Sequence, residues 1–413
     1  MAKHDPYEAF RVKAFRLYAL GWFASLVGTQ IQGAAIGWEM YARTGQALAL
    51  GLVGLAIALP TMILALPAGY LADRYNRRTV MMLSMAGTTL TSLGLAVLSW
   101  KKGPIGVMYA LLVVDAAVTV LGSPARRSII PQLVPREIFP NAVAWTMSMM
   151  QTAWMVEPAL GGLIAAYYVP AAYLVSAGCT GWFLLVLSQL HVPPVEREEG
   201  AEQVSAFRNL MGGLVFLKEN RLLLSVMALD MFAVLLGGAV YLLPIYATDI
   251  LNVGSEGYGI LRAAPAVGAL VMALTIAHLP PMKRAGRNLL LTVAGFGVAT
   301  IVFGLSENFW LSFVMLVLTG AFDNVSMVIR HTLVQLITPD SMRGRVSAVN
   351  GVFVSASNEL GGAESGGVAA LYGPVFSVVS GGIGTLVVVG VTAVISPKLR
   401  KVGTLDELEE GKG

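Results

Sequence analysis

The chain has 413 residues, of which 56% are hydrophobic and 13% are charged, and its formal net charge is +4. Soluble globular domains carry about 25% charged residues, so this composition excludes that class and predicts an all-α membrane protein with many spans. The basic residues lie in short segments along the whole chain, so the positive charge does not indicate a nucleic-acid partner. A single cysteine, Cys179, excludes an internal disulfide framework.

Apolar stretches of about 20 residues, each long enough to cross a bilayer as a helix, recur along the chain. We predict twelve transmembrane helices, at residues 14–40, 48–72, 79–99, 104–126, 141–168, 170–190, 221–248, 256–279, 288–305, 309–331, 346–371 and 375–396. We expect no cleaved signal peptide before the first span. With both termini in the cytoplasm, only four of the 28 Lys and Arg residues fall outside, as the positive-inside rule requires: Arg43, Lys101, Lys102 and Arg262.

The longest polar break divides the chain near its middle. It predicts a six-helix bundle over residues 1–191, a cytoplasmic linker over 192–220, a second six-helix bundle over 221–396 and a cytoplasmic tail over 397–413 that we expect to be frayed. Internal repetition supports two related halves, since residues 127–134 recur in similar form at 330–337. A transporter built from such repeats binds its substrate between the halves near the middle of the membrane. We expect a monomer.

A charged turn joins the second and third predicted spans. It resembles the signature loop of the major facilitator superfamily, Gly-x-Leu-Ala-Asp-Arg-x-Gly-Arg-Arg, and matches it at Gly69, Asp73, Arg74, Arg77 and Arg78. Asn76 replaces a glycine of the pattern, and asparagine is the residue that next best tolerates a left-handed backbone.

The resemblance implies the twelve-helix major facilitator fold, and it implies that this loop latches the two halves. The carboxylate of Asp73 would then lie near the N-terminus of the eleventh helix, where the helix dipole favours an anion. The alternative is a solvated basic loop that only fixes the topology.

Carboxyl groups inside spans are the main functional candidates, because a charged side chain in the membrane is costly unless it faces a cavity or a partner. The candidates for proton coupling are Asp115, Glu157, Asp230, Asp323, Glu359 and Glu364. Asp115 lies near the middle of its span with no basic residue within a helical turn, so desolvation favours its protonated form, and it could carry a proton or be a structural carboxyl. For Asp230 and Asp323, a buried ion pair with Arg330 or another loop arginine is an equally good interpretation.

Polar side chains at similar depth are candidates for binding a substrate. They are Gln30, Gln32, Glu39, Asn324 and Asn358. For the two glutamines, a hydrogen bond between helices is the alternative.

Two glycine-rich segments indicate close helix packing. Residues 157–162 resemble the Gly-Pro-x-x-Gly-Gly motif of drug and proton antiporters in the superfamily, with Glu157 in place of the first glycine, which predicts a helix bend at Pro158, Gly161 and Gly162. In the eleventh predicted span, Asn358, Gly361, Gly362 and Ser365 share one face, and Glu359 and Glu364 cannot both point the same way. We expect one of these two glutamates to face the cavity.

The chain contains no phosphate-binding loop and no histidine pair with metal-ligand spacing, so we expect a protein that is not an enzyme and has no cofactor or metal. Residues 37–41 and 339–350 are similar to the bacterial branch of the superfamily that includes enterobactin exporters and, more distantly, macrolide efflux proteins. This resemblance implies proton-coupled export of an amphipathic organic molecule, siderophore or drug-like, across the bacterial inner membrane. Membrane lipids would surround it. The alternatives are a lipid or lysophospholipid flippase on the same fold and a non-transporting membrane receptor or scaffold.

Overall fold

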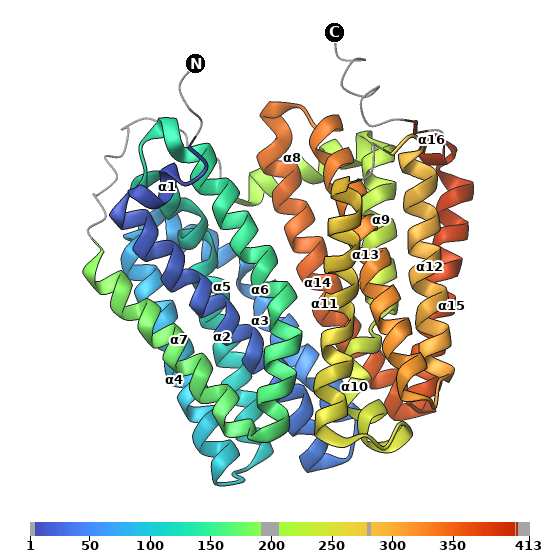
Figure 1. The fold of residues 1–413 in the computed structure, drawn as a ribbon. Helices are drawn as coiled ribbons and strands as arrows, with labels where there is room; N and C mark the ends of the chain where they lie inside the picture. Colours follow the sequence, from blue (N-terminus) through green and yellow to red (C-terminus); the bar gives the residue numbers. More distant parts are fainter. Residues whose placement is uncertain (1–4, 191–205, 279–281, 401, 404–413) are drawn as a thin grey trace. The chain divides into compact units, whose positions relative to one another are not determined.

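A computed structural model describes residues 5–190, 206–278, 282–400 and 402–403 (Figure 1). Helices are the regular elements of this part of the chain, and it contains no strand. The first half holds α1 (Glu8–Arg11), α2 (Lys13–Thr44), α3 (Ala47–Arg74), α4 (Arg77–Trp100), α5 (Ile105–Leu133), η1 (Arg136–Ile138), α6 (Phe139–Tyr167) and α7 (Val169–Gln189). The second half holds α8 (Ala206–Glu219), α9 (Arg221–Leu236), η2 (Ala239–Leu242), α10 (Leu243–Ile245), η3 (Tyr246–Ile250), α11 (Gly254–His278), α12 (Ala285–Leu305), α13 (Phe309–Ile337), α14 (Asp340–Tyr372), α15 (Pro374–Ile395) and α16 (Pro397–Arg400).

Eleven of the predicted spans coincide with long helices and the seventh with a helix that is interrupted, which confirms the predicted fold class of twelve transmembrane helices. Within the described ranges, nine helices are long and apolar enough to cross a membrane on these grounds alone. Helical structure is what a spanning segment requires, because lipid offers no hydrogen-bond partner to backbone N–H and C=O groups. Polar caps begin several of the helices: the Asn308 side chain, for example, accepts a hydrogen bond of 3.0 Å from Leu311 N at the start of α13.

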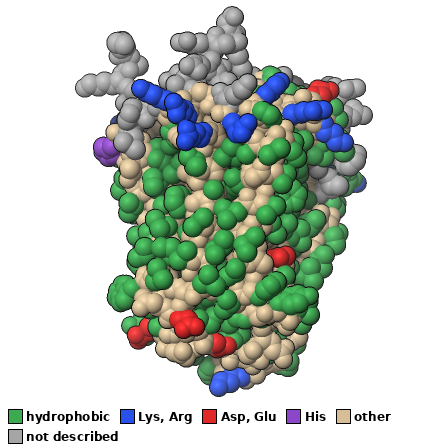
Figure 2. Space-filling model, turned by 90° about the vertical axis from the view of Figure 1, so that its right-hand side faces the viewer, with side chains coloured by type: hydrophobic (Ala, Val, Ile, Leu, Met, Phe, Trp, Pro, Cys, Tyr) green, Lys and Arg blue, Asp and Glu red, His purple; other side chains and the backbone are tan. Residues whose placement is uncertain are grey.

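The outward faces of the helices are apolar. Leu83 and Leu90, two turns apart on α4, are 69% and 68% exposed. Figure 2 shows one face of the protein on which hydrophobic side chains cover the middle and Lys and Arg gather near one end. Such a surface fits the hydrocarbon core of a bilayer and its charged boundary. The chain is therefore a multi-pass membrane protein.

The chain forms two compact units. One contains Met1–Glu39 and Ala56–Ala206, and the other contains Met40–Leu55 and Phe207–Gly413. The core of the first unit includes Phe15 and Tyr18 of α2 and Phe183 of α7, all at most 1% exposed. The core of the second unit includes Leu229 of α9 and Ile329 of α13.

Helix α8 lies within residues 192–220, the range that the sequence assigns to a linker, and it packs on the start of α14 in the second unit. Leu217 is 1% exposed and lies in one apolar cluster with Val346 and Val349. A Cβ at Gly213 would lie 2.6 Å from the carbonyl oxygen of Arg345. The close approach of α8 to α14 therefore depends on a glycine at this position.

The expectation that the tail is frayed was wrong for its first residues. Pro397–Arg400 form α16, and Leu399 is fully buried in the core of the second unit. Ala285 N donates a hydrogen bond of 3.1 Å to Gly403 O, so the same segment supplies an acceptor for a free N–H at the start of α12. The remaining residues, 404–413, lie outside the described ranges.

The seventh predicted span, 221–248, is not a continuous α-helix. Helix α9 ends at Leu236, and after Gly237 and Gly238 the chain continues as a short 3-10 helix, one α-helical turn and a π-helix to Ile250. A Cβ at Gly237 would lie 2.6 Å from the Phe296 ring, and one at Gly238 would lie 2.3 Å from Ser365 Oγ. The two glycines thus allow the α-helix to end here, and they leave the space that the Phe296 ring and the Ser365 hydroxyl occupy.

The predicted packing face of the eleventh span is confirmed for three of its four members. Gly361 approaches the backbone of α9, Gly362 approaches the ring of Tyr241, and Ser365 Oγ lies against Gly238. Asn358, the fourth member, is exposed. Further along α14, a Cβ at Gly366 would lie 2.3 Å from the backbone nitrogen of Gly51 in the same unit.

The substitution Gly366→Ala should therefore lower the stability of the protein. Its methyl group has no room against the α3 backbone, and we expect a loss of about 1–3 kcal/mol, the usual cost of overpacking. Thermal unfolding in detergent measures the effect. The matched control is Gly367→Ala, because a Cβ at Gly367 meets no atom within 4 Å. If both variants melt like the wild type, the close contact does not constrain the fold.

Candidate functional site

The carboxyl group of Asp115, on α5 in the first unit, is held by two neutral hydrogen-bond donors. Thr91 Oγ1 on α4 lies 2.6 Å from Asp115 Oδ1, and Gln32 Nε2 on α2 lies 3.3 Å from Oδ2. The side chain is half-buried. None of the described Lys and Arg side chains forms an ion pair with it. Its charge, when present, is therefore stabilised by hydrogen bonds alone.

Further hydrogen bonds connect this carboxyl to α7. Ser92 Oγ donates to Gln32 Oε1 over 2.7 Å, and it lies 3.3 Å from Ser176 Oγ of α7. Gln32, Ser92 and Ser176 are all at most 4% exposed. We call these side chains the Asp115 network: Asp115, Thr91, Gln32, Ser92 and Ser176. It joins α2, α4, α5 and α7 inside the first unit, and for Gln32 it confirms the alternative of a hydrogen bond between helices.

The hydroxyl members of this network, on α4 and α7, are absent from the candidates that the sequence suggests, which are carboxyl and amide side chains. A usable signal was present on α4. Its buried face contains five hydroxyl residues at helical spacing: Ser84, Thr88, Thr91, Ser92 and Ser99. A helix whose polar face is buried and whose apolar face is exposed indicates an internal hydrogen-bond network in a membrane protein.

Glu39, a predicted substrate-binding residue, forms a hydrogen bond within its own unit. It is 5% exposed, and its Oε2 accepts a hydrogen bond of 2.8 Å from the hydroxyl of Tyr173 on α7. Gln30 is half-buried on the same helix as Gln32. The structure thus places the Glu39 carboxyl in a contact between α2 and α7, and its role in binding a substrate stays a prediction.

In the second unit, Asp230 of α9 forms a buried ion pair with Arg330 of α13. Their side chains are 11% and 7% exposed. This pair is the interpretation that the sequence left open for Asp230. Because its charge is compensated inside the unit, Asp230 is suited to fixing α9 against α13.

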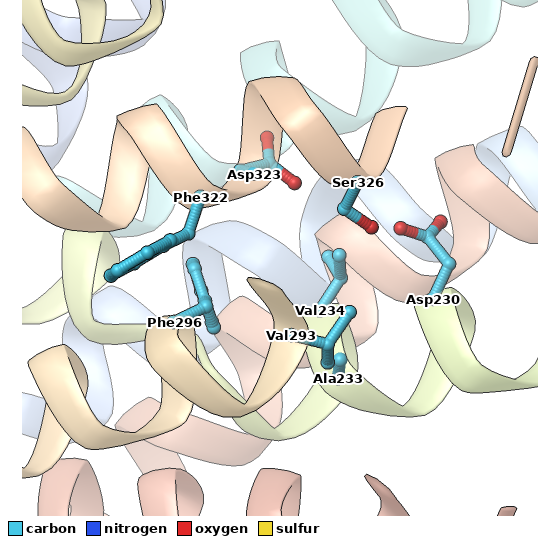
Figure 3. A pocket seen from close by; sticks show the side chains of 8 residues that line it. All are labelled: Asp230, Ala233, Val234, Val293, Phe296, Phe322, Asp323 and Ser326. Atoms are coloured by element: carbon cyan, nitrogen blue, oxygen red, sulfur yellow. The ribbon is translucent and has the colours of Figure 1, made fainter. Parts of the chain in front are cut away.

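A small cavity lies beside this pair (Figure 3). Helices α9, α12 and α13 line it with Asp230, Ala233, Val234, Val293, Phe296, Phe322, Asp323 and Ser326. In Figure 3 the Ser326 hydroxyl and the Asp230 carboxyl point toward one another, and the Asp323 carboxyl lies further along α13. The cavity has room for about one water molecule, so it is too small for an organic substrate.

The other polar candidates of the second unit are spread over two helices. Asn324 of α13 is 7% exposed, and within the described residues its Oδ1 has no hydrogen-bond partner. On α14, Asn358 donates a hydrogen bond of 2.9 Å to Val354 O one turn before it. Glu359 and Glu364 are both half-buried, and Glu364 accepts a hydrogen bond of 3.3 Å from Ser365 Oγ. Their roles in coupling or binding stay predictions.

The signature loop connects α3 and α4 tightly. Asn76, which replaces a glycine of the pattern, does not use a left-handed backbone: its φ is −60°, and its side chain caps α4 by accepting a hydrogen bond of 2.9 Å from Arg78 N. Asparagine fits here as a helix cap.

The arginines of this loop bind backbone carbonyls of neighbouring helices. Arg77 donates to Ser128 O of α5 over 2.9 Å, and Arg78 donates to Leu187 O at the end of α7 over 2.8 Å. Arg78 thus places a cation at a helix C-terminus, where the helix dipole favours it. Arg74 is exposed and donates to the hydroxyl of Tyr70 one turn before it.

Three side chains named by the sequence analysis lie outside the described part, namely those of Asp73, Glu157 and Pro158. Their helices α3 and α6 are described at the backbone, and α6 stays helical from Phe139 to Tyr167. Gly161 packs α6 closely on α2, since a Cβ there would lie 2.7 Å from the Cβ of Ala34. In the described part of the chain, no group of three or more His, Cys, Asp and Glu side chains could hold a metal ion.

Solved transporter structures share this fold. A peptide transporter POT superposes with a TM-score of 0.70, at 12% identity over 97% of this chain and 100% of that chain. A bacterial homologue of the human lysosomal transporter Spinster, in an inward-facing and occupied conformation, superposes with a TM-score of 0.68, at 15% identity over 97% of this chain and 99% of that chain. At these identities the likeness concerns the fold alone. The fold of this chain is therefore the twelve-helix major facilitator fold.

The family can be stated more narrowly. The family described as "transmembrane secretion effector" matches residues 4–410, and the chain belongs to it. The enterobactin exporter EntS of Escherichia coli O1:K1 / APEC is 28% identical over 394 residues, covering 94% of this chain and 93% of that protein. The enterobactin exporter EntS of Shigella boydii serotype 4 (strain Sb227) is 29% identical over 397 residues, with the same coverage.

The Asp230–Arg330 pair generates a stability prediction. Asp230→Asn leaves the buried Arg330 charge uncompensated, and we expect a loss of about 3–5 kcal/mol, seen as a lower melting temperature and a smaller yield of folded protein. The double variant Asp230→Leu/Arg330→Met removes both charges and should recover most of this loss. A double variant as unstable as the single one would show that the pair is not the source of the effect.

Proposed function

We propose that this transporter exports an amphipathic organic molecule in exchange for protons, and that Asp115 is the group that carries the proton. The observation that supports this is the environment of the carboxyl. Two neutral donors bind it, and no described Lys or Arg pairs with it. Addition of a proton to such a group removes a charge from the membrane interior, whereas removal of a proton creates one.

Asp230 offers an instructive contrast in the same chain. It forms a buried ion pair with Arg330, and the loss of its charge would leave the guanidinium unpaired. A carboxyl without a cationic partner can exchange protons at a lower cost. We therefore assign coupling to Asp115 and stability to Asp230.

The resemblance to enterobactin exporters supports the direction and the class of substrate. Identity of 28% over 94% of the chain makes an exported organic molecule with both polar and apolar parts, siderophore or drug-like, the natural candidate. The chain would act as a monomer in the bacterial inner membrane with both termini in the cytoplasm. The linker over 192–220 and the signature loop would then lie on the cytoplasmic side.

Transport into sealed vesicles that hold the purified protein and an inside-acid pH gradient tests this proposal. The probes are enterobactin, a macrolide, a cationic dye and a lysophospholipid. The wild type should accumulate one of the first three classes, and Asp115→Asn should reduce accumulation by about tenfold or more, equivalent to at least 1.4 kcal/mol of coupling. Exchange of labelled for unlabelled probe without a gradient should persist, because it needs no net proton movement.

The control variant is Glu307→Gln, which removes an exposed carboxyl between α12 and α13 and should transport like the wild type. Movement of the lysophospholipid without a gradient, with no movement of the soluble probes, would replace export with flippase activity. Full proton-driven transport by Asp115→Asn would assign coupling to another group.

The signature loop carries a second transport prediction. We propose that Asp73 latches the halves during the access cycle, as the resemblance implies. Asp73→Asn should then slow transport by about tenfold while leaving the melting temperature unchanged, because one hydrogen bond to a charged group contributes about 1.5–3 kcal/mol. Initial rates in the same vesicles measure the effect. An unaltered rate would leave the loop with a topological role only.

A further inference from the structure

The Thr91 hydroxyl has two hydrogen-bond acceptors within reach but only one hydrogen to donate. Its Oγ1 lies 2.6 Å from Asp115 Oδ1 and 3.0 Å from the backbone oxygen of Thr88, one turn earlier on α4. A hydroxyl group donates one hydrogen bond and can accept two. The same atomic positions therefore allow two alternative hydrogen-bond arrangements.

The first arrangement suits a charged Asp115. The Thr91 hydroxyl donates to Oδ1, and Gln32 Nε2 donates to Oδ2. Both carboxylate oxygens then have a donor, and Thr88 O keeps its bond within the helix.

The second arrangement suits a neutral Asp115. A proton on Oδ1 makes this atom a donor, and it donates to Thr91 Oγ1. The Thr91 hydrogen turns to Thr88 O, and Oδ2, now a carbonyl oxygen, still accepts from Gln32. The only covalent change is one O–H bond on Asp115. No hydrogen bond of the carboxyl is lost in either state.

We propose that Thr91 is the positioning residue of the coupling site: by reversing its hydroxyl between Asp115 Oδ1 and Thr88 O, it allows Asp115 to bind and release a proton without leaving an unpaired polar group in the membrane interior. This inference rests on the proposed role of Asp115 in coupling. A buried donor or acceptor without a partner costs about 1–3 kcal/mol, so a site that pairs its groups in only one protonation state would favour that state.

The Gln32 amide is held in one orientation, so the change in hydrogen bonding takes place at the Thr91 hydroxyl. Its Oε1 accepts from Ser92, which holds the amide in one orientation with its nitrogen toward Asp115. A rotation of the amide would break the bond to Ser92 and present an acceptor to a charged carboxylate. The reversible element is therefore the hydroxyl.

Few other titratable groups lie within two helical turns of the Asp115 network on the helices that carry it. On α2, Glu39 is two turns from Gln32 and is bound to Tyr173 of α7. Cys179 lies one turn from Ser176 on α7, and Tyr109 lies on α5 before Asp115. Helix α4 has no titratable side chain between Arg78 and Lys101. The pH response of the site is thus expected to follow Asp115 itself.

Infrared difference spectroscopy of the reconstituted protein tests the inference without a substrate. A carboxyl C=O band that titrates with pH in the wild type and is lost in Asp115→Asn reports the protonation of this group. Thr91→Ser keeps the hydroxyl and should reproduce the wild-type band. Thr91→Val keeps the shape but removes the hydroxyl, so it should change the band frequency and move its midpoint by about one pH unit toward higher pH, because the charged form loses the stronger hydrogen bond.

The matched control is Thr119→Val, which removes a threonine hydroxyl one turn from Asp115 on α5 that pairs with Thr88 Oγ1. This variant should titrate like the wild type. A Thr91→Val titration identical to that of the wild type would overturn the role of Thr91. If no titrating band depends on Asp115, the inferred role of Thr91 is overturned as well. The infrared band could behave as expected while transport in vesicles is independent of the pH gradient. That result would support the proton site and refute only the proposed coupled export.

The transport assay separates positioning from stability. With enterobactin as the probe, the proton-driven transport rate of Thr91→Val should be about tenfold below that of the wild type. Its exchange rate without a gradient and its melting temperature should stay near the wild-type values. Thr91→Ser keeps the hydroxyl and should transport at the wild-type rate. Equal loss in both assays would show a structural role and contradict the inference.

Discussion

The constraint on which this structure depends is the cost of an unpaired polar group in a membrane. A buried hydroxyl, amide or carboxyl without a partner inside the protein is costly, because lipid supplies none. Around Asp115 in the first unit this cost is avoided by neutral groups, and the Asp115 network links four helices through a threonine, a glutamine and two serines. The carboxyl at its centre is paired but not neutralised. That combination is the basis of the proton exchange proposed for this site.

The second unit meets the same constraint in another way. Asp230 and Arg330 compensate each other, and the glycines at 237 and 238 let the chain leave the α-helical path where Phe296 and Ser365 press against it. The freed backbone groups are re-paired in short 3-10 and π-helical turns. Interrupted helices of this kind occur near the substrate sites of transporters. The proposed proton site thus lies in the first unit, and the second unit contains an interrupted helix of the kind that lines such substrate sites.

Much of the fold could be predicted from the sequence because apolar length and the positions of basic residues determine spans directly. The ends of helices and the details of the site depend on contacts that a single sequence does not specify. The sequence shows that Asn76 replaces a glycine of the loop pattern, but its role as the cap of α4 appears only in the structure. Leu399 was placed in a frayed tail, but it fills the core between α9 and α12. Asp115 and Gln32 were both named as candidates, whereas their link through Thr91 and Ser92 required the positions of three helices.

In the proposed mechanism, proton exchange at Asp115 is coupled to the transported molecule, so binding of that molecule should release a proton. Detergent-solubilised protein is mixed with enterobactin in a weakly buffered solution that contains a pH indicator. Binding to the wild type should change the pH by an amount proportional to the protein, and Asp115→Asn should bind the compound without this change. An equal pH change in the two proteins would refute the role of Asp115, because the proton would then come from a different group.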